Sequence, residues 1–259
     1  MKQSTRFLSL ACAAALASLT LSTAASAETG TLRVTFKYKG TAPAASTIDP
    51  TNDKAFCGKK DIPDESLIVN KDNNGIKNVM LYVYTGRGGT KLPKMDLEPK
   101  VHELANKECR FEPHIVVAKV GDTVRVTNPD EVGHNANFAF FKNEGQNPTV
   151  PAGGSVDIKL EETEPAPIPV TCNIHNWMQA RVLVLDHPFA AVSDENGVLE
   201  IKDIPVGEIT FRGNHESGSM TKVIIEGKET DWKRGRFEIE IKPGMNDLGV
   251  VEIPADAFK

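Results

Sequence analysis

Hydrophobic and polar positions alternate along most of the chain with a period of two, the pattern of half-buried β-strands. The alternating runs are rich in Val, Ile, Thr and aromatic residues, and turn sequences such as KDNNG and SDENG separate them. Residues 96–107 are the one stretch compatible with a short helix. The pattern predicts an all-β fold of sandwiches or barrels, with strands at 31–38, 78–84, 114–120, 123–128, 155–160, 180–186, 198–201, 208–212, 222–227 and 236–241.

The N-terminus has the pattern of an export signal. Lys2 and Arg6 precede an apolar stretch at residues 7–21, and the small residues Ala-Ser-Ala at 25–27 then supply a cleavage pattern. The alternative is a membrane anchor, but about 15 apolar residues fall short of the ~20 that span a bilayer. We therefore expect a signal peptide cleaved after Ala27 and a periplasmic or secreted mature chain without a membrane span.

The overall composition is that of a globular protein, with 40% hydrophobic and 25% charged residues. The 30 basic and 35 acidic residues give a net charge of -5, and no run of Lys or Arg offers the basic stripe that phosphate binding needs. We therefore expect no nucleic-acid partner. The sequence shows no catalytic triad, substrate-activating carboxylate pair or glycine-rich phosphate loop, which indicates a protein that is not an enzyme.

Cysteine usage is the most informative part of the composition. The chain has 4 cysteines, and Cys12 would leave with the signal peptide. An odd number then remains in an oxidising compartment, so one thiol stays unpaired and needs an explanation. Cys57 and Cys109 lie at turn-like edges and are expected to form a disulfide, which leaves Cys172 free.

Cys172, His175 and Met178 lie within the short sequence CNIHNWM, and His134 follows an expected strand about forty residues earlier. Two imidazoles, one thiolate and one thioether are the donor set of a trigonal copper site with a weak axial Met, and copper binding would explain the free thiol. Zinc is the main alternative metal, but thioether is a poor zinc ligand. Asn176 stands where a binuclear copper site would need a second Cys, so we expect one mononuclear copper ion.

These residues and their surroundings resemble the cupredoxins, the family of type 1 blue copper proteins. The loop Cys-x₂-His-x₂-Met and the stretch FEPHIVVAKVGDTVRVTNPDEVGHN are similar to the family's ligand motifs, and the resemblance covers residues 108–186. It implies a Greek-key β-sandwich in which His134, Cys172 and His175 are the equatorial copper ligands and Met178 is the axial ligand.

The resemblance also assigns roles around the ligands. Asn135 matches the family's Asn whose side chain joins the two ligand loops. Trp177 would either shield the metal from water or pack in the core. His175 would lie near the protein edge and form the exit for electrons. The implied function is one-electron transfer with a redox partner such as a c-type cytochrome, a copper oxidase or a dehydrogenase.

Two other functional classes fit the same residues. In the first, the protein is a periplasmic copper-binding chaperone or storage protein, and the metal is its cargo. In the second, it is a structural module that binds carbohydrate or protein, and the copper site is vestigial. The visible spectrum and the redox behaviour of the copper-loaded protein separate these classes from the electron carrier.

Residues 190–212 resemble the transthyretin-like module that is related to carboxypeptidase regulatory domains. Strands of the kind that open such a module, GTLRVTFKYKG and NVMLYVY, lie before the copper-binding stretch. We therefore expect a signal peptide at 1–27, an N-terminal β segment at 28–100, a cupredoxin-like domain at 101–186 and a C-terminal β segment at 187–259. Either the two flanking segments pair into a second, smaller β-sandwich, or the N-terminal segment belongs to the cupredoxin sandwich.

Three further histidines each have two interpretations. His114 begins an expected strand and is either a half-buried strand residue or an additional metal ligand. His187 and His215 are isolated in the sequence. They would form a second metal site only if the fold brought them together, and otherwise they have packing or surface roles.

Overall fold

β-Strands make up nearly all the regular structure of the computed structural model, which describes residues 28–258. The all-β prediction is therefore confirmed, whereas the signal peptide expected at residues 1–27 lies outside the described residues. The prediction of a short helix at residues 96–107 is wrong. Val101–Lys107 instead forms strand β3, because parallel pairing with strand β6 (Thr123–Thr127) satisfies its backbone and buries Leu104.

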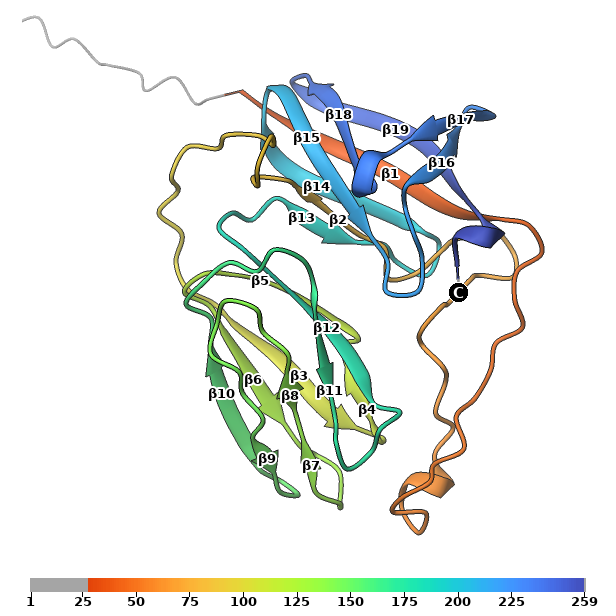
Figure 1. Cartoon of the computed structure of the whole chain (residues 1–259), viewed down its shortest axis with the longest axis vertical. Helices are drawn as coiled ribbons and strands as arrows, with labels where there is room; N and C mark the ends of the chain where they lie inside the picture. Colours follow the sequence, from red (N-terminus) through yellow and green to blue (C-terminus); the bar gives the residue numbers. More distant parts are fainter. Residues whose placement is uncertain (1–27, 259) are drawn as a thin grey trace, which may run out of the picture.

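Strands from both ends of the described chain build the first β-sandwich (Figure 1). They are β1 (Thr29–Lys39), β2 (Met80–Val83), β13 (Ala190–Val192), β14 (Val198–Pro205), β15 (Gly207–Asn214), β16 (Lys222–Ile225), β17 (Lys228–Asp231), β18 (Arg236–Ile241) and β19 (Gly244–Pro254). One sheet has the order β14-β1-β19-β16-β17 and the other has the order β13-β2-β15-β18. The apolar faces of the two sheets enclose large side chains such as Phe36, Phe211 and Trp232. In this sandwich β1 and β2 therefore pair with strands from the C-terminal part of the chain.

The middle of the chain builds a second sandwich that carries the predicted copper ligands. Besides β3 and β6, its strands are β4 (Arg110–Glu112), β5 (Ile115–Lys119), β7 (His134–Asn135), β8 (Asn137–Phe138), β9 (Thr149–Val150), β10 (Ser155–Lys159), β11 (Ile168–Thr171) and β12 (Gln179–Leu185). The sheets have the orders β10-β6-β3-β4 and β5-β12-β11-β8, and β7 pairs with β9. Buried residues including Phe111, Val126 and Val182 form a core separate from that of the first sandwich.

A long irregular connection joins β1 to β2. Figure 1 shows it leaving the first sandwich, running down beside the second sandwich past the end that carries β7, and returning. A backbone hydrogen bond from Ile48 to Ile62 closes a loop within it, and this loop contains the 3₁₀ turn η1 (Cys57–Lys59). We call residues 46–64 the cover segment, because they lie over the second sandwich.

The two sandwiches are joined by apolar and by charged contacts. A cluster of buried side chains from β2 and β12 lies between them: Met80, Tyr82, Leu183 and Leu185. Beside it, Arg181 of the second sandwich forms an ion pair at 3.1 Å with Glu216, which follows β15 of the first sandwich. Packing and charge therefore both fix the position of the second sandwich.

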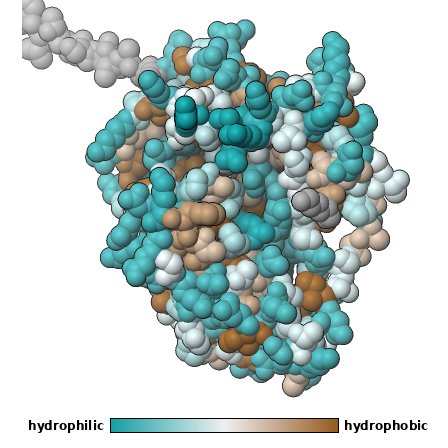
Figure 2. Space-filling view, in the orientation of Figure 1, coloured by the Kyte–Doolittle hydropathy of each residue, from teal (hydrophilic) through white to brown (hydrophobic). Residues whose placement is uncertain are grey.

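The surface in Figure 2 is mostly polar, and its apolar residues form small separate patches. Exposed large apolar side chains include Phe141, Met245 and, next to a predicted ligand, Ile174. Within residues 28–258, no helix combines the length and the apolar character needed to cross a membrane.

Candidate metal centre

The ligand loop, residues 172–178, connects β11 to β12 at one end of the second sandwich. Antiparallel pairing of Thr171 with Gln179 brings the two ends of the loop together. The Cys172 N–H donates to the Met178 carbonyl at 3.2 Å, and the Met178 N–H donates to the His175 carbonyl at 2.9 Å. The His175 N–H also approaches Cys172 Sγ at 3.4 Å. These contacts hold the loop in a tight turn that places Cys172 and His175 side by side.

His134 reaches the same place from a separate turn. It forms β7 with Asn135, and β7 pairs with β9. Successive side chains of an extended chain point to opposite faces, so His134 shares a face with Ala136 and Phe138. Both of these residues are buried in the core of the second sandwich. The His134 side chain is therefore directed inward, and it is fully buried.

Three of the four predicted copper ligands converge on one buried point. His134 Nδ1 lies 2.9 Å from His175 Nδ1, and Cys172 Sγ lies 3.8 Å from His175 Nδ1. The ligating atoms of all three residues lie within 4.8 Å of one another. Cys172 is the free cysteine among the described residues. A single ion can therefore contact a thiolate and two imidazoles here.

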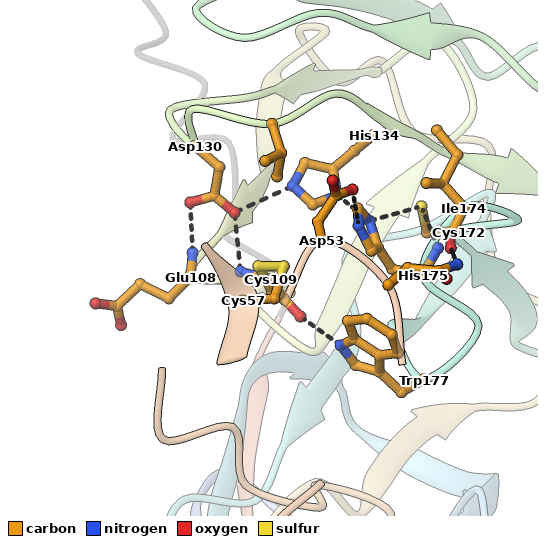
Figure 3. The surroundings of a disulfide bond; sticks show 12 residues. Asp53, Cys57, Glu108, Cys109, Asp130, His134, Cys172, Ile174, His175 and Trp177 are labelled. Carbon is orange, nitrogen blue, oxygen red and sulfur yellow. Dashed lines mark hydrogen bonds and ion pairs between the residues drawn. A yellow bond between two sulfur atoms is a disulfide. The ribbon is translucent and has the colours of Figure 1, made fainter. Parts of the chain in front are cut away.

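Each of these histidines is held at its other ring nitrogen by a carboxylate (Figure 3). His134 Nε2 lies 3.1 Å from Asp130 Oδ2, and His175 Nε2 lies 2.9 Å from Asp53 Oδ2. A carboxylate at Nε2 keeps the proton on that nitrogen and leaves Nδ1 free to bind a metal. Sequence analysis missed both carboxylates. Asp130 stands close before His134 and offered a local signal, whereas Asp53 offered none.

The electrostatics of the site favour a thiolate. Burial would raise the pKa of Cys172, but hydrogen bonds with His134 and His175 and with two backbone N–H groups lower it to about 5. Burial likewise opposes the charged form of His134, yet its contacts with Asp130 and Cys172 raise its pKa above the ordinary value. The pKa of Asp130 is lowered: burial opposes the shift, but hydrogen bonds from His134 and from backbone N–H groups outweigh it. At neutral pH the site therefore presents a deprotonated sulfur.

Asn135 joins the two turns that supply the ligands. Its Oδ1 accepts the N–H groups of Asn173 at 2.8 Å and Ile174 at 3.3 Å, and it lies 3.3 Å from Cys172 Sγ. Its amide nitrogen donates to Asn147, which fixes the orientation of the amide. The side chain thus lies where the cupredoxin resemblance places the residue that links the ligand loops.

Met178 and Trp177 occupy the second half of the ligand loop. Met178 is buried in the same apolar cluster as Cys172, and its role as axial ligand stays a prediction. The Trp177 ring lies 5.1 Å from the His175 ring, and Trp177 Nε1 donates to the Cys109 carbonyl at 3.0 Å. Trp177 therefore covers one side of His175 and ties it to the turn that contains Cys109.

The expected disulfide between Cys57 and Cys109 is present, and both residues are fully buried. It attaches the cover segment to the turn between β3 and β4. The Cys109 N–H donates at 2.8 Å to Asp130 Oδ2, the same oxygen that contacts His134. The disulfide therefore lies beside the metal centre, as Figure 3 shows.

His175, which was expected near the protein edge, is covered rather than exposed to solvent. The His175 side chain is 0% exposed, because the cover segment lies over it. Asn52 Nδ2 donates to the Ile174 carbonyl at 2.6 Å, next to the contact between Asp53 and His175. The cover segment is 122 residues distant from the ligand loop in sequence, and no local pattern connects the two.

The donor set fits copper and excludes hard cations. Thiolate and imidazole are ligands of copper and zinc, whereas Mg²⁺ and Ca²⁺ need several oxygens. The two neighbouring carboxylates, Asp53 and Asp130, are engaged at the Nε2 side of the histidines, away from the point where the three donors meet. Cys109 also lies near Asp130 and His134, but its sulfur is committed to the disulfide.

His114 lies in a buried charged cluster rather than among the predicted ligands. Its Nε2 contacts Glu216, and its Nδ1 lies 3.8 Å from Glu65 Oε2. Glu65 also pairs with Arg110 at 3.1 Å, and Glu216 pairs with Arg181. These five residues link both sandwiches to the chain that follows the cover segment. His114 therefore has a structural role where these three parts of the molecule meet.

His187 and His215 are packed separately. His187 Nε2 lies 3.0 Å from the Val83 carbonyl, and the His215 ring is nearly perpendicular to that of Phe258, with ring centroids 5.4 Å apart. Burial lowers the pKa of both imidazoles, that of His215 to about 4. Among residues 28–258, no group of three ligating side chains includes either histidine or His114.

No protein-family model and no curated protein matches the sequence. Among solved structures, a copper-containing nitrite reductase from Thermus scotoductus is similar over 39% of this chain and 26% of that one, with 20% identity and a TM-score of 0.32. The match thus spans about a quarter of the length of the nitrite reductase. A Cu(I) form of an amicyanin mutant is similar over 32% of this chain and 81% of its own, with 20% identity and a TM-score of 0.30. A purple cupredoxin from Nitrosopumilus maritimus is similar over 32% of this chain and 98% of its own, with 22% identity and a TM-score of 0.28.

Proposed function

We propose that this protein is an exported, mononuclear copper protein that carries single electrons between redox partners. The observation that carries the proposal is the buried convergence of His134 Nδ1, His175 Nδ1 and Cys172 Sγ. Two imidazoles and one thiolate are the trigonal donor set of blue-copper electron-transfer sites, and Met178 is the proposed weak axial ligand.

The side chains around the donors prepare the site for this role. The lowered pKa of Cys172 supplies the thiolate that copper requires. Asp53 and Asp130 fix the two imidazole rings, and Asn135 holds the two ligand turns together. A bound copper ion would supply one-electron redox chemistry, which needs little rearrangement of ligands that are already held in place.

We further propose that the protein acts as a carrier rather than as an enzyme. All four proposed ligands are buried, and a complete ligand set leaves no position for a substrate. The partner would be another redox protein, such as a c-type cytochrome, a copper oxidase or a dehydrogenase. Export is supported by the signal-like sequence at residues 1–27 and by the disulfide, which persists in oxidising compartments.

A potentiometric titration of the copper-loaded mature protein, followed by its visible spectrum, tests the proposal. We expect an intense copper–thiolate absorption that disappears and returns through one reversible one-electron step. Cys172→Ser is the matched variant, and it should abolish the absorption because the serine hydroxyl replaces the thiolate. Failure of the wild-type protein to bind copper, or binding without this absorption, would overturn the proposal.

A copper storage or chaperone role is the second candidate. It is favoured by the complete burial of His175 beneath the cover segment, which would slow exchange with a partner. Under this alternative the copper-loaded protein is a colourless Cu(I) form that resists oxidation. The same titration therefore separates cargo from carrier.

A further inference from the structure

The backbone of the cover segment is shaped to present Asp53 to the metal centre. Asp53 adopts a left-handed conformation with φ of 47°, which Asn and Asp tolerate better than most other residues. Its carbonyl accepts the N–H groups of Phe56 at 2.9 Å and Cys57 at 2.8 Å. This tight turn directs the carboxylate toward His175 Nε2.

The cover segment is fastened at several points around this contact. The disulfide from Cys57 and the hydrogen bond from Asn52 to the Ile174 carbonyl flank Asp53 in sequence. Buried Ile62 packs in the same small cluster as the disulfide, against which Trp177 also lies. Asp53 is therefore held over His175 by contacts that do not depend on its own side chain.

Asp53 and Asp130 make equivalent contacts but differ in their surroundings. The Asp130 side chain is 5% exposed, and it also accepts backbone N–H groups of the disulfide turn. The Asp53 side chain is 45% exposed, and His175 Nε2 is the side-chain partner of its carboxylate. Removing the Asp53 carboxylate therefore removes its contact with His175, whereas removing that of Asp130 also breaks hydrogen bonds to backbone N–H groups.

We propose that Asp53 is a positioning residue of the metal centre. Its carboxylate fixes the ring orientation and the protonated nitrogen of His175. Its negative charge holds the reduction potential of the copper below that of the same site with a neutral partner, because an anion near the metal favours Cu(II) over Cu(I). The part that concerns the potential rests on the proposed function.

The cover segment also limits access to the copper. With Asp53 and Asn52 seated on the ligand loop, the cover segment closes the edge formed by His175. A redox partner would therefore meet the cover segment rather than the bare imidazole. Asp53 then stands between the ligand and the partner.

Three variants separate the effect of the Asp53 charge, the effect of its hydrogen bond with His175 and the effect of losing a negative charge elsewhere in the cover segment. Asp53→Asn keeps the shape, the left-handed turn and an acceptor oxygen, but it removes the charge. Asp53→Ala removes the hydrogen bond as well. Asp61→Asn is the control. Asp61 is an exposed residue of the same cover segment, and in the described structure it forms no hydrogen bond with His134 or His175.

The first measurement is the reduction potential of the copper-loaded variants. We expect Asp53→Asn and Asp53→Ala to raise the potential with the copper–thiolate absorption retained, and Asp61→Asn to leave it close to the wild-type value. An unchanged potential in Asp53→Asn, or an equal rise in Asp61→Asn, would overturn the role of the Asp53 charge.

The second measurement uses the metal-free protein. Diethylpyrocarbonate modifies accessible imidazole nitrogens, and peptide mass mapping reports His175 separately. We expect His175 to be protected in the wild type and in Asp53→Asn, but to be modified in Asp53→Ala, because the smaller side chain opens a path to Nε2. Rapid modification of His175 in the folded wild type would overturn the positioning role. If the protein binds no copper while His175 is protected in this way, the proposed function fails and the positioning of His175 by Asp53 stands.

Discussion

Asp130 and His134 are joined through Oδ2 and Nε2 at 3.1 Å, and this contact couples the metal centre to the disulfide. The same carboxylate accepts the N–H groups of Glu108 at 2.7 Å and Cys109 at 2.8 Å. One buried side chain thus orients a proposed copper ligand and stabilises the turn that carries Cys109.

Asp130→Asn should damage both functions of this carboxylate. The amide has one acceptor oxygen in place of two, so a buried N–H loses its partner, at a cost of about 1–3 kcal/mol in unfolding free energy. Copper affinity should fall roughly 10–100-fold because His134 is no longer held by an anion. Urea unfolding of the metal-free protein and competition with a copper chelator measure the two effects. Asp157→Asn is the control, since Asp157 pairs with Arg125 on the exposed surface, and wild-type copper affinity in Asp130→Asn would contradict the account.

Asn135→Ala should loosen the ligand loop. The substitution removes the acceptor for the Asn173 and Ile174 N–H groups, so these amides should exchange with solvent faster in the metal-free protein. We expect a loss of about 1–3 kcal/mol in unfolding free energy and a weaker copper–thiolate absorption. Asn176→Ala, at an exposed position of the same loop, should change neither quantity. Unchanged amide exchange in Asn135→Ala would contradict the linking role.

Met178→Leu tests the axial ligand. Leucine preserves the apolar volume of this buried position but removes the thioether. Because the axial bond is weak, we expect the variant to keep copper and its colour while the reduction potential rises. Loss of copper from Met178→Leu would contradict the assignment of Met178 as a weak axial ligand.

Replacement of the disulfide by the pair Cys57→Ser and Cys109→Ser should release the cover segment. A cross-link between residues separated by 52 positions contributes roughly 4 kcal/mol by the chain-entropy estimate. We expect a lower melting temperature and faster amide exchange over residues 46–64. If the double variant folds and keeps the wild-type exchange rates in this segment, the disulfide is not what fastens it.

Stability should fall as the pH drops from about 6.5 toward 4. Burial lowers the pKa of His215 to about 4, whereas an unfolded chain restores it to about 6.5. Within this window the unfolded chain binds a proton that the folded chain excludes, so the folded state loses up to roughly 3 kcal/mol. Above pH 6.5 the imidazole is neutral in both states, so its titration no longer changes the free energy of unfolding.

His215→Gln isolates this contribution, because the remaining groups titrate equally in both proteins. Urea unfolding at pH 7.5 and at pH 5 should show a smaller loss of stability for the variant than for the wild type. The same loss in both proteins would contradict a buried, neutral His215.

The sequence predicted those features that depend on local patterns. Period-two alternation indicated the β fold, and the spacing of Cys172, His175 and Met178 marked one loop as a candidate site. The cysteine count led to the Cys57–Cys109 pair. Each of these signals lies within a short window of sequence or follows from counting, so no knowledge of long-range contacts was needed.

Apart from Asp130, which lies close before His134 in the sequence, the features that escaped prediction depend on long-range contacts. The placement of Asp53 over His175 joins segments that no periodicity connects, and so the burial of His175 was missed. The stretch at residues 96–107 carries charges at spacings compatible with a helix, but pairing of Val101–Lys107 with β6 decided its conformation. Tertiary pairing overrides weak local preference in such a segment.

X-ray absorption at the copper edge of the loaded protein tests the central claim most directly, because it reports the atoms bound to the metal. We expect one short bond to sulfur and two bonds to imidazole nitrogen, with the sulfur bond lost in Cys172→Ser. A wild-type copper environment of nitrogen and oxygen alone, identical to that of Cys172→Ser, would contradict it.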